Sequence, residues 1–200
     1  MNLPKSKYKR RKRRKGHFWG VSFYHEIVEV KSHKNKEEVK SMIRKVQTNE
    51  YGQLVDFLYE AIFVKEGEVP PNRDIVNQPE LMIYVDKFGE CKDDEALFYV
   101  LNGRAVGAIW VRIMDDYGHI DNQTPSLAMS VLKPYRHQGI GRQLLQAMLV
   151  LLKQKGYERV SLSVSKENTV AIHLYQKQGF LTLLEREEDL LMTCDLGPLR

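Results

Sequence analysis

The sequence predicts an α/β (α+β) domain with a central, mixed and mostly antiparallel sheet of six to seven strands, flanked by about four helices. Short stretches in which apolar and polar residues alternate indicate strands. Longer stretches in which apolar residues recur every three or four positions indicate helices, and the two kinds are interleaved along the chain. An Asn-Gly pair at positions 102 and 103 predicts a tight hairpin between two of the strands. A chain of 200 residues with 42% hydrophobic composition is long enough to bury one core.

The first predicted strand covers residues 42–46 and is followed by a helix with one apolar face. That face consists of Leu54, Val55, Leu58, Ala61 and Ile62. Prolines at positions 70, 71 and 79 interrupt the next stretch. We therefore expect only short helices there, near residues 73–77 and 81–85.

Three strands are expected to follow these short helices. Residues 96–101 and 106–113 form the predicted hairpin around Asn102 and Gly103. Residues 127–132 form the third strand. Pro134 then stops this strand, because proline has no backbone N–H to donate.

A strongly amphipathic helix is predicted next. It begins near Ile140, and Gly156 closes it as a C-terminal cap would. Its apolar face consists of Ile140, Leu144, Leu145, Met148, Leu151 and Leu152. Residues 159–165 then alternate apolar residues with serines, which predicts a strand with one buried face. A helix within residues 168–179 and two further strands complete the order.

The N-terminal part of the chain has a different composition. Nine of the 31 Lys and Arg residues lie between Lys5 and Lys15, and without them 22 basic residues face 26 acidic ones, a net charge of −4. We expect residues 1–17 to be a disordered basic arm that suits an anionic partner such as RNA, DNA or a membrane surface. A solvated tail without a dedicated partner would have the same composition.

The remaining chain divides into three expected segments. Residues 18–40 hold an apolar stretch, which either adds an edge strand or packs on the domain, and a charged linker. Residues 41–196 form the domain, and residues 197–200 are a short C-terminal tail.

Several classes of protein are excluded by what the sequence lacks. No run approaches the roughly 18 apolar residues that a membrane-spanning helix needs. The charged N-terminus is not followed by an uninterrupted apolar run of the kind a secretory signal has, so a secretory signal is not expected and the cytoplasm is the expected location. Cys91 and Cys194 are expected to be free thiols, and no spacing of ligands predicts a metal site.

The junction at residues 136–141, which reads Arg-His-Gln-Gly-Ile-Gly, is a candidate anion site. It connects a strand to the start of a helix, where unpaired N–H groups and the helix dipole attract negative charge. Gly139 and Gly141 would let the backbone approach a phosphate closely, and Arg136, His137 and Arg142 add side-chain donors. Ordinary turn chemistry would also place glycines at such a junction.

A second motif downstream gives the junction a more specific meaning. Residues 168–180 continue the pattern after the serine-rich strand. In order and spacing, the two motifs together resemble the GNAT acyltransferase superfamily over roughly residues 41–196. The residues that carry the resemblance are Val131, Pro134, Arg136, Gly139 and Gly141, followed by Asn168, Ala171, Tyr175, Gly179 and Phe180.

The resemblance implies a GNAT fold whose sheet splays between its fourth and fifth strands, here residues 127–132 and 159–165. It implies acetyl-CoA as co-substrate, with no metal. Backbone groups of Met129, Ser130 and Val131 would pair with the pantetheine arm like an added strand. The diphosphate would be held by Arg136, His137, Gln138, Gly139, Ile140, Gly141 and Arg142.

Two residues of the second motif also receive roles from the resemblance. Asn168 would bond pantetheine where the strands splay, and the hydroxyl of Tyr175 would protonate the departing CoA thiolate. Taken singly, Tyr175 also suits a core aromatic position and Asn168 a helix N-cap, for which Ser165 and Glu167 compete. Their joint spacing favours CoA binding.

The base that deprotonates an acceptor amine is harder to predict. Relatives carry a glutamate at the position of Ser126 or of Ser163, and this chain has neither carboxylate. Asp115, Asp116, His119 and Asp121 remain as candidates just before residue 126, and His119 has the ordinary pKa best suited to the task.

These observations predict an N-acetyltransferase that transfers an acetyl group to a primary amine by direct attack in a ternary complex. The acceptor is expected to be a small molecule or a protein, and the acidic body favours a cationic one such as a polyamine, an aminoglycoside-like amine or a lysine-rich protein. The protein is expected to be a monomer or a homodimer. A non-catalytic CoA-binding module, or one that docks to nucleic acid through its arm, is the alternative.

Overall fold

The computed structural model describes residues 28–30 and 40–197, and the basic arm and the charged linker lie outside this part. Its strands are β1 Val28–Val30, β2 Ser41–Lys45, β3 Glu95–Leu101, β4 Arg104–Arg112, β5 Ser126–Val131, β6 Arg159–Ser165, β7 Leu181–Glu185 and β8 Asp189–Asp195. Its α-helices are α1 Leu54–Ala61, α2 Pro79–Met82, α3 Ile140–Gln154 and α4 Thr169–Lys177. Three 3₁₀ helices are η1 Thr48–Gln53, η2 Arg73–Asn77 and η3 Lys133–Tyr135.

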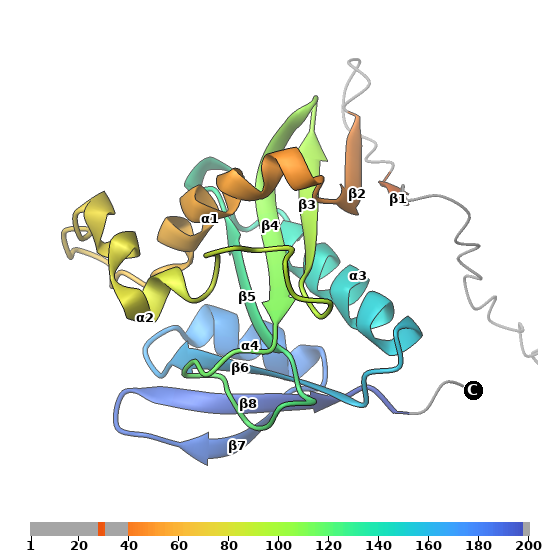
Figure 1. The fold of residues 1–200 in the computed structure, drawn as a ribbon. Helices are drawn as coiled ribbons and strands as arrows, with labels where there is room; N and C mark the ends of the chain where they lie inside the picture. The colour runs from red at the N-terminus through yellow and green to blue at the C-terminus, as the bar shows by residue number, and fades with distance from the viewer. Residues whose placement is uncertain (1–27, 31–39, 198–200) are drawn as a thin grey trace, which may run out of the picture.

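All the strands belong to one sheet, in the order β1-β2-β3-β4-β5-β6-β8-β7. Neighbouring strands are antiparallel except β5 and β6, which are parallel and share the single registered pair Ser126 with Ser161. Figure 1 shows β6, β7 and β8 turned away from β2 to β5 beyond that pair. The predicted fold class and the splay are confirmed. The eighth strand is β1, an edge strand within the apolar stretch 18–30.

Most predicted elements occur within two residues of their expected bounds, but the segment between β2 and β3 differs. Residues 73–77 form a 3₁₀ helix, and the helix expected at 81–85 begins at Pro79 and ends at Met82. Proline at the first helical position costs no hydrogen bond, which favours the earlier start. Tight turns then carry the chain from Ile83 to β3.

The hairpin between β3 and β4 forms as the sequence predicts. Asn102 and Gly103 both have positive φ, 49° and 81°, which is the geometry of a type I′ turn. The register of β3 against β4 shifts between Tyr99 and Val100. Such a β-bulge bends and twists the strand locally.

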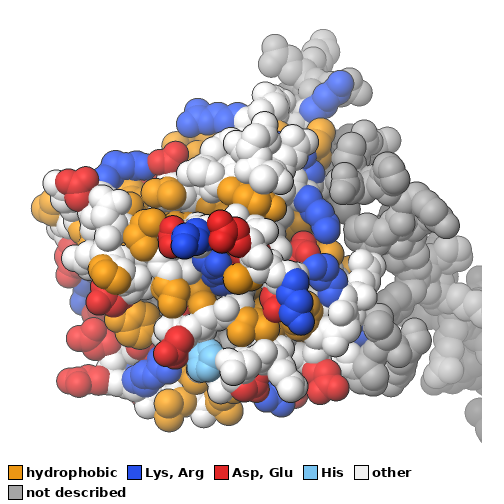
Figure 2. All heavy atoms as spheres, in the orientation of Figure 1, with side chains coloured by type: hydrophobic (Ala, Val, Ile, Leu, Met, Phe, Trp, Pro, Cys, Tyr) orange, Lys and Arg blue, Asp and Glu red, His pale blue; other side chains and the backbone are white. Residues whose placement is uncertain are grey.

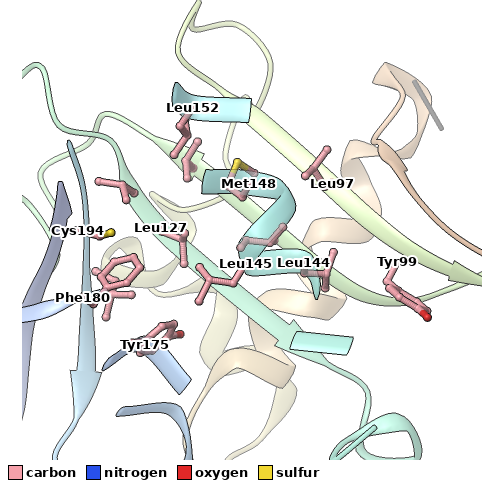
Figure 3. Close-up of a cluster of buried hydrophobic side chains, with 14 of the residues drawn as sticks. Leu97, Tyr99, Leu127, Leu144, Leu145, Met148, Leu152, Tyr175, Phe180 and Cys194 are labelled. Atoms are coloured by element: carbon pink, nitrogen blue, oxygen red, sulfur yellow. The ribbon is translucent and has the colours of Figure 1, made fainter. Parts of the chain in front are cut away.

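Helices cover both faces of the sheet, and each face has its own core. Leu97 and Tyr99 of β3 belong to one core, with α3 and α4, whereas Phe98 and Val100 belong to the other, with α1 and α2. This alternation follows from the two-residue period of a strand. Figure 3 shows the first core, in which Leu144, Leu145 and Met148 of α3 lie over the sheet beside Tyr175 and Phe180.

Three further observations on the described residues concern cysteines, membrane-spanning helices and metal ligands. Cys91 is exposed, Cys194 is buried, and both are free thiols as expected. Within residues 28–30 and 40–197, no helix has the length and apolar character needed to cross a membrane. In the same part of the chain, no cluster of three His, Cys, Asp or Glu residues could hold a metal ion.

Candidate functional site

A cavity of about 840 Å³ lies where β5 and β6 separate. Its walls come from the end of α1 and the loop after it, from β5, from the start of α3, and from the ends of β6 and α4. Pockets of 300 to 1,000 Å³ are typical of small-molecule sites. The residues of both sequence motifs therefore meet at one cleft, whose lining includes residues of α1 and α4. Figure 1 shows where these two helices lie relative to the sheet.

One wall of the cleft is the open edge of β5. Leu132 donates its N–H to Val106 on β4, at 2.9 Å, so every second residue of β5 faces β4. Ser130 is one of these, and it pairs with Ala108. Met129 and Val131 face the other way, toward the gap left by β6, and their backbone groups are positioned to pair with an extended ligand.

Ser130 contributes differently from the role that the resemblance implies. Its backbone belongs to the β4 ladder, and its buried hydroxyl donates to the carbonyl of Phe57 on α1, at 2.7 Å. Ser130 lines the cavity but fastens α1 to β5. The expected three-residue pairing edge is therefore reduced to Met129 and Val131.

The start of α3 forms the second wall. The first helical bond of this region runs from Gln143 N–H to the Gly139 carbonyl, at 3.1 Å, which leaves the N–H groups of Ile140, Gly141 and Arg142 available to a ligand. Gly139 has φ of 79°, a left-handed conformation that glycine adopts without the steric cost that other residues incur. At Gly141 a Cβ atom would lie 3.2 Å from Cε of Met129, so this glycine allows α3 to lie close to β5.

Two side chains of this loop, those of Arg136 and Gln138, have hydrogen-bond partners within the protein. Nε of Arg136 donates to the Val131 carbonyl at 2.8 Å, and Nη2 pairs with the carboxylate of Glu60 at 3.0 Å. Arg136 thus ties α1 to the end of β5. Gln138 is absent from the cavity lining and donates to the Pro134 carbonyl at 3.2 Å, whereas His137 lines the cavity with a positive φ of 61°.

The opposite wall holds Asn168 and Tyr175. Oδ1 of Asn168 accepts the N–H of Ala171 at 3.2 Å, so the residue is the N-cap of α4 while it also lines the cavity. Tyr175 is buried beside Phe180, with ring centroids 5.5 Å apart. Burial raises the pKa of the Tyr175 hydroxyl to about 12, so it stays protonated and can donate a hydrogen bond into the cleft.

The family model for the acetyltransferase (GNAT) family matches residues 61–180 of this chain. That match spans more than half of the sequence and includes most of the residues that line the cleft. This chain belongs to the GNAT family. The family expected from the sequence motifs is thereby confirmed.

Solved GNAT structures share the fold. The paia N-acetyltransferase of Thermoplasma acidophilum, in complex with coenzyme A, is 20% identical with a TM-score of 0.59, covering 78% of this chain and 98% of that one. The ribosomal-protein-S18-alanine N-acetyltransferase of Escherichia coli is 17% identical with a TM-score of 0.57, covering 80% and 96%.

Curated GNAT relatives match over shorter stretches. The N-alpha-acetyltransferase of Sulfurisphaera tokodaii is 37% identical over 112 residues, which cover 51% of this chain and 66% of that protein. The chain therefore spans just under two thirds of that relative's length, and it spans 28%, 24% and 23% of three others.

The candidate bases of this GNAT domain lie outside the cavity lining. The Nδ1 atom of His119 is 2.9 Å from the Met114 carbonyl, an interaction that holds the imidazole within its own loop. Asp115 is exposed, and Asp121 accepts the N–H groups of Gln123 and Thr124. The role of His119 as the base therefore stays a prediction, and His119 itself is not among the residues that line the cavity.

Two cavity residues were missed by the sequence motifs. Lys65, after α1, pairs with Glu167, after β6, at 2.5 Å across the cleft. Tyr84 lines the cavity from the segment after α2. Neither residue belongs to a motif with a recognisable spacing in the sequence. The partner of Lys65 lies far away in the chain, so only the folded structure shows the contact.

Proposed function

We propose that this protein transfers an acetyl group from acetyl-CoA to a primary amine by direct attack within a ternary complex. One observation carries the proposal. Three features line the cavity between β5 and β6. They are the edge of β5 that lacks a strand partner, the N-terminus of α3 with its glycine-containing loop, and the buried hydroxyl of Tyr175. Acetyl-CoA has a part to match each feature: an arm with two amides for the strand edge, a diphosphate for the helix N-terminus, and a thioester sulfur for the tyrosine hydroxyl.

The first of these features would bind the pantetheine arm. The backbone groups of Met129 and the N–H of Val131 face the gap and can pair with amides of the arm as an added strand would, whereas the Val131 carbonyl already accepts a bond from Arg136. The thioester carbonyl would accept a backbone N–H from this edge, which polarises it for attack. The amide of Asn168 retains its Nδ2 donor after Oδ1 has capped α4, and we assign this donor to the same arm.

The diphosphate would bind at the start of α3. The N–H groups of residues 140–142 point out of the helix end, and the αL conformation of Gly139 turns the loop around them. His137 and Arg142 line the cavity and are exposed, so they can add charge-assisted bonds. Arg136, which is bonded to Glu60, keeps the position of the loop instead.

Tyr175 would donate a hydrogen bond to the leaving sulfur. When the amine nitrogen bonds to the thioester carbon, the carbon–sulfur bond breaks and negative charge develops on sulfur. A hydroxyl whose pKa burial raises to about 12 remains a donor throughout the neutral range. The side chain is fixed by its packing on Phe180, which limits its loss of freedom during the reaction.

The acceptor half of the cleft is formed by the loop after α1 and the segment around α2. Val64, Glu68, Pro70 and Tyr84 line it. Figure 2 shows acidic and basic side chains interspersed among hydrophobic ones on this face, rather than a field of one sign. We propose a primary amine on a small molecule or protein as acceptor, with Glu68 favouring a cationic one.

The experiment is a thiol-release assay with acetyl-CoA and a panel of amines that includes a polyamine, an aminoglycoside and peptides with free N-termini or lysines. The proposal expects CoA release that depends on at least one amine. Acetyl-CoA binding without any amine-dependent release would instead support the non-catalytic module. A Tyr175→Phe variant that binds acetyl-CoA but turns over slowly would distinguish the two further.

A further inference from the structure

The guanidinium group of Arg136 connects three elements of the cleft. Arg136 itself belongs to the loop between β5 and α3. Its Nε atom donates to the Val131 carbonyl, at the end of β5, at 2.8 Å. Its Nη2 atom donates to the backbone carbonyl of Glu60, on α1, at 3.2 Å and to the Glu60 carboxylate at 3.0 Å. One side chain therefore fixes the end of α1 against the end of β5.

The end of α1 is a favourable place for this cation. The last carbonyls of a helix lack helical partners, and the C-terminus of a helix carries partial negative charge. Glu60 is the last residue but one of α1, and its side chain is 19% exposed, against 40% for Arg136. Solvent therefore screens the pair only in part. A planar guanidinium can also bond two partners at fixed directions, which an ammonium group does less well.

A second contact holds α1 to the same strand. The buried hydroxyl of Ser130 donates to the carbonyl of Phe57, about one turn before Glu60, at 2.7 Å. The last turn of α1 is thus attached at two points to the segment that contains Met129 and Val131. These are the residues whose backbone groups face the gap between β5 and β6.

The chain continues from α1 along the acceptor half of the cleft. Helix α1 ends at Ala61, and residues 62–72 form the loop before η2, which we call the acceptor loop. Residues 62–65 and Glu68 of this loop line the cavity. The contacts that fix the end of α1 therefore also fix where the acceptor loop begins relative to β5.

We propose that Arg136 is a positioning residue for the acceptor and not a ligand of the diphosphate. It holds the start of the acceptor loop at a set distance from the strand edge that binds the thioester. The amine must reach the thioester carbon at the right distance and angle, and a displacement of about 1 Å can cost about 100-fold in rate. The inference rests on the proposed function, which assigns the acceptor to this loop.

Three variants test the role of Arg136. Arg136→Gln removes the charge, and Arg136→Lys keeps the charge but cannot bridge β5 and α1 in the same way, although a lysine still binds phosphate well. Glu60→Gln weakens the contact from the other side. The matched controls are Arg142→Gln, at an exposed residue that lines the cavity, and Glu66→Gln, at an exposed residue of the acceptor loop outside the cavity lining. Urea melts check that each variant stays folded.

Binding measurements distinguish a positioning residue from a diphosphate ligand. Calorimetry is carried out with acetyl-CoA and with acetyl-pantetheine, which lacks the diphosphate. We expect Arg142→Gln to bind acetyl-CoA about tenfold more weakly, as the loss of one charge-assisted bond implies, and to bind acetyl-pantetheine as the wild type does. Both Arg136 variants should bind the two donors with affinities close to those of the wild type.

Kinetic measurements with the amine that the wild type accepts best test the effect on the acceptor. We expect kcat/KM for the amine to fall by about 10- to 100-fold in Arg136→Gln and in Arg136→Lys, while KM for acetyl-CoA stays the same. Glu60→Gln should lose less, because the backbone carbonyl of Glu60 remains, and Glu66→Gln should match the wild type. The double variant Glu60→Gln/Arg136→Gln should lose no more than Arg136→Gln alone, since both changes remove the same contact.

Two results would overturn the positioning role. One is an Arg136→Gln variant that binds acetyl-CoA more weakly but acetyl-pantetheine normally, with the affinity restored in Arg136→Lys, because this is the behaviour of a diphosphate ligand. The other is an unchanged kcat/KM for the amine in all three variants of an active enzyme. Failure of the proposed function is seen separately, in a wild type that shows no amine-dependent release of CoA, and this inference would then fail with it.

Discussion

Nζ of Lys65 lies 2.5 Å from Oε1 of Glu167, and this contact joins the two walls of the cleft across 102 residues of sequence. The Glu167 carboxylate raises the pKa of the Lys65 ammonium, so the lysine remains charged throughout the neutral range. Both side chains are more than half exposed, and solvent weakens their attraction. We therefore expect the pair to affect how fast a ligand enters and leaves the cleft, and to contribute little to the free energy of unfolding.

Breaking this contact should change ligand exchange and leave stability unchanged. We expect Lys65→Gln to speed CoA dissociation by about two- to fivefold at low salt, with the difference lost near 1 M salt. The matched control is Lys166→Gln, which breaks the exposed pair of Lys166 with Glu185. Stopped-flow displacement of CoA measures the rates, and equal rates for the two variants would contradict the prediction.

Gly139 offers a test of the anion site that separates strain from binding. Gly139→Ala forces an alanine into the αL conformation, which costs about 1 kcal/mol. Gly156→Ala imposes the same cost at the other end of α3, where φ is 85° and nothing lies within 4 Å of the added Cβ. Both variants should lose similar stability to urea, but only Gly139→Ala should weaken acetyl-CoA binding, as calorimetry would show.

Tyr175→Phe should separate catalysis from binding. We expect kcat to fall by about 100-fold while the affinity for acetyl-CoA changes little, because the hydroxyl acts on the leaving sulfur. The control is Tyr157→Phe, which removes a hydroxyl bonded to Asp93 outside the cleft. Equal kcat values in wild type and Tyr175→Phe would exclude Tyr175 as the proton donor.

Tyr175 should also contribute to alkaline unfolding. Its pKa is about 12 in the folded state and about 10 when unfolded. Above roughly pH 10 the unfolded chain releases this proton while the folded chain keeps it, so stability falls as the pH rises to about 12. In the Tyr175→Phe variant, the free energy of unfolding should decrease by roughly 2 to 3 kcal/mol less than in the wild type over this pH range. Denaturant melts at each pH measure the difference. Parallel pH profiles for the two proteins would argue against it.

A buried ion pair fixes the segment that carries Tyr84. Nε of Arg112 lies 3.2 Å from Asp94, whose side chain is fully buried, and Arg112 also donates to the carbonyls of Ile83 and Asp86 at 2.8 and 2.9 Å. We expect Asp94→Asn to cost about 3 kcal/mol, since it leaves a buried cation uncompensated. Asp195→Asn, at an exposed pair with Arg159, should cost at most about 1 kcal/mol in the same urea melts.

The repeating parts of the fold could be predicted from sequence because their causes are local. The serine-rich strand 159–165 has the predicted bounds, and the hairpin follows from Asn102 and Gly103 alone. The cap at Asn168 was also within reach, since such residues commonly start helices. The helix expected at residues 81–85 instead begins at Pro79, because a helix of four residues makes barely one turn and shows too little periodicity to locate its start.

Only those site residues that lie close together in the sequence, within one motif, could be predicted. Gly139 and Gly141 lie where their motif implied, but the partner of Arg136 is Glu60 on a helix 76 residues earlier. The sequence offered four candidate bases before residue 126 and favoured His119, and it had no means of showing that Asp116 accepts the hydrogen bond of the Ser126 hydroxyl. Such contacts depend on how the loop folds back on the sheet, which periodicity does not describe.

The single registered pair between Ser126 and Ser161 also bears on the shape of ligand that the cleft can hold. Beyond it, the described parts of β5 and β6 share no ladder of hydrogen bonds, so β5 keeps an edge without a strand partner. An extended ligand would satisfy that edge along its length, as a neighbouring strand does, whereas a compact ligand would leave it unpaired.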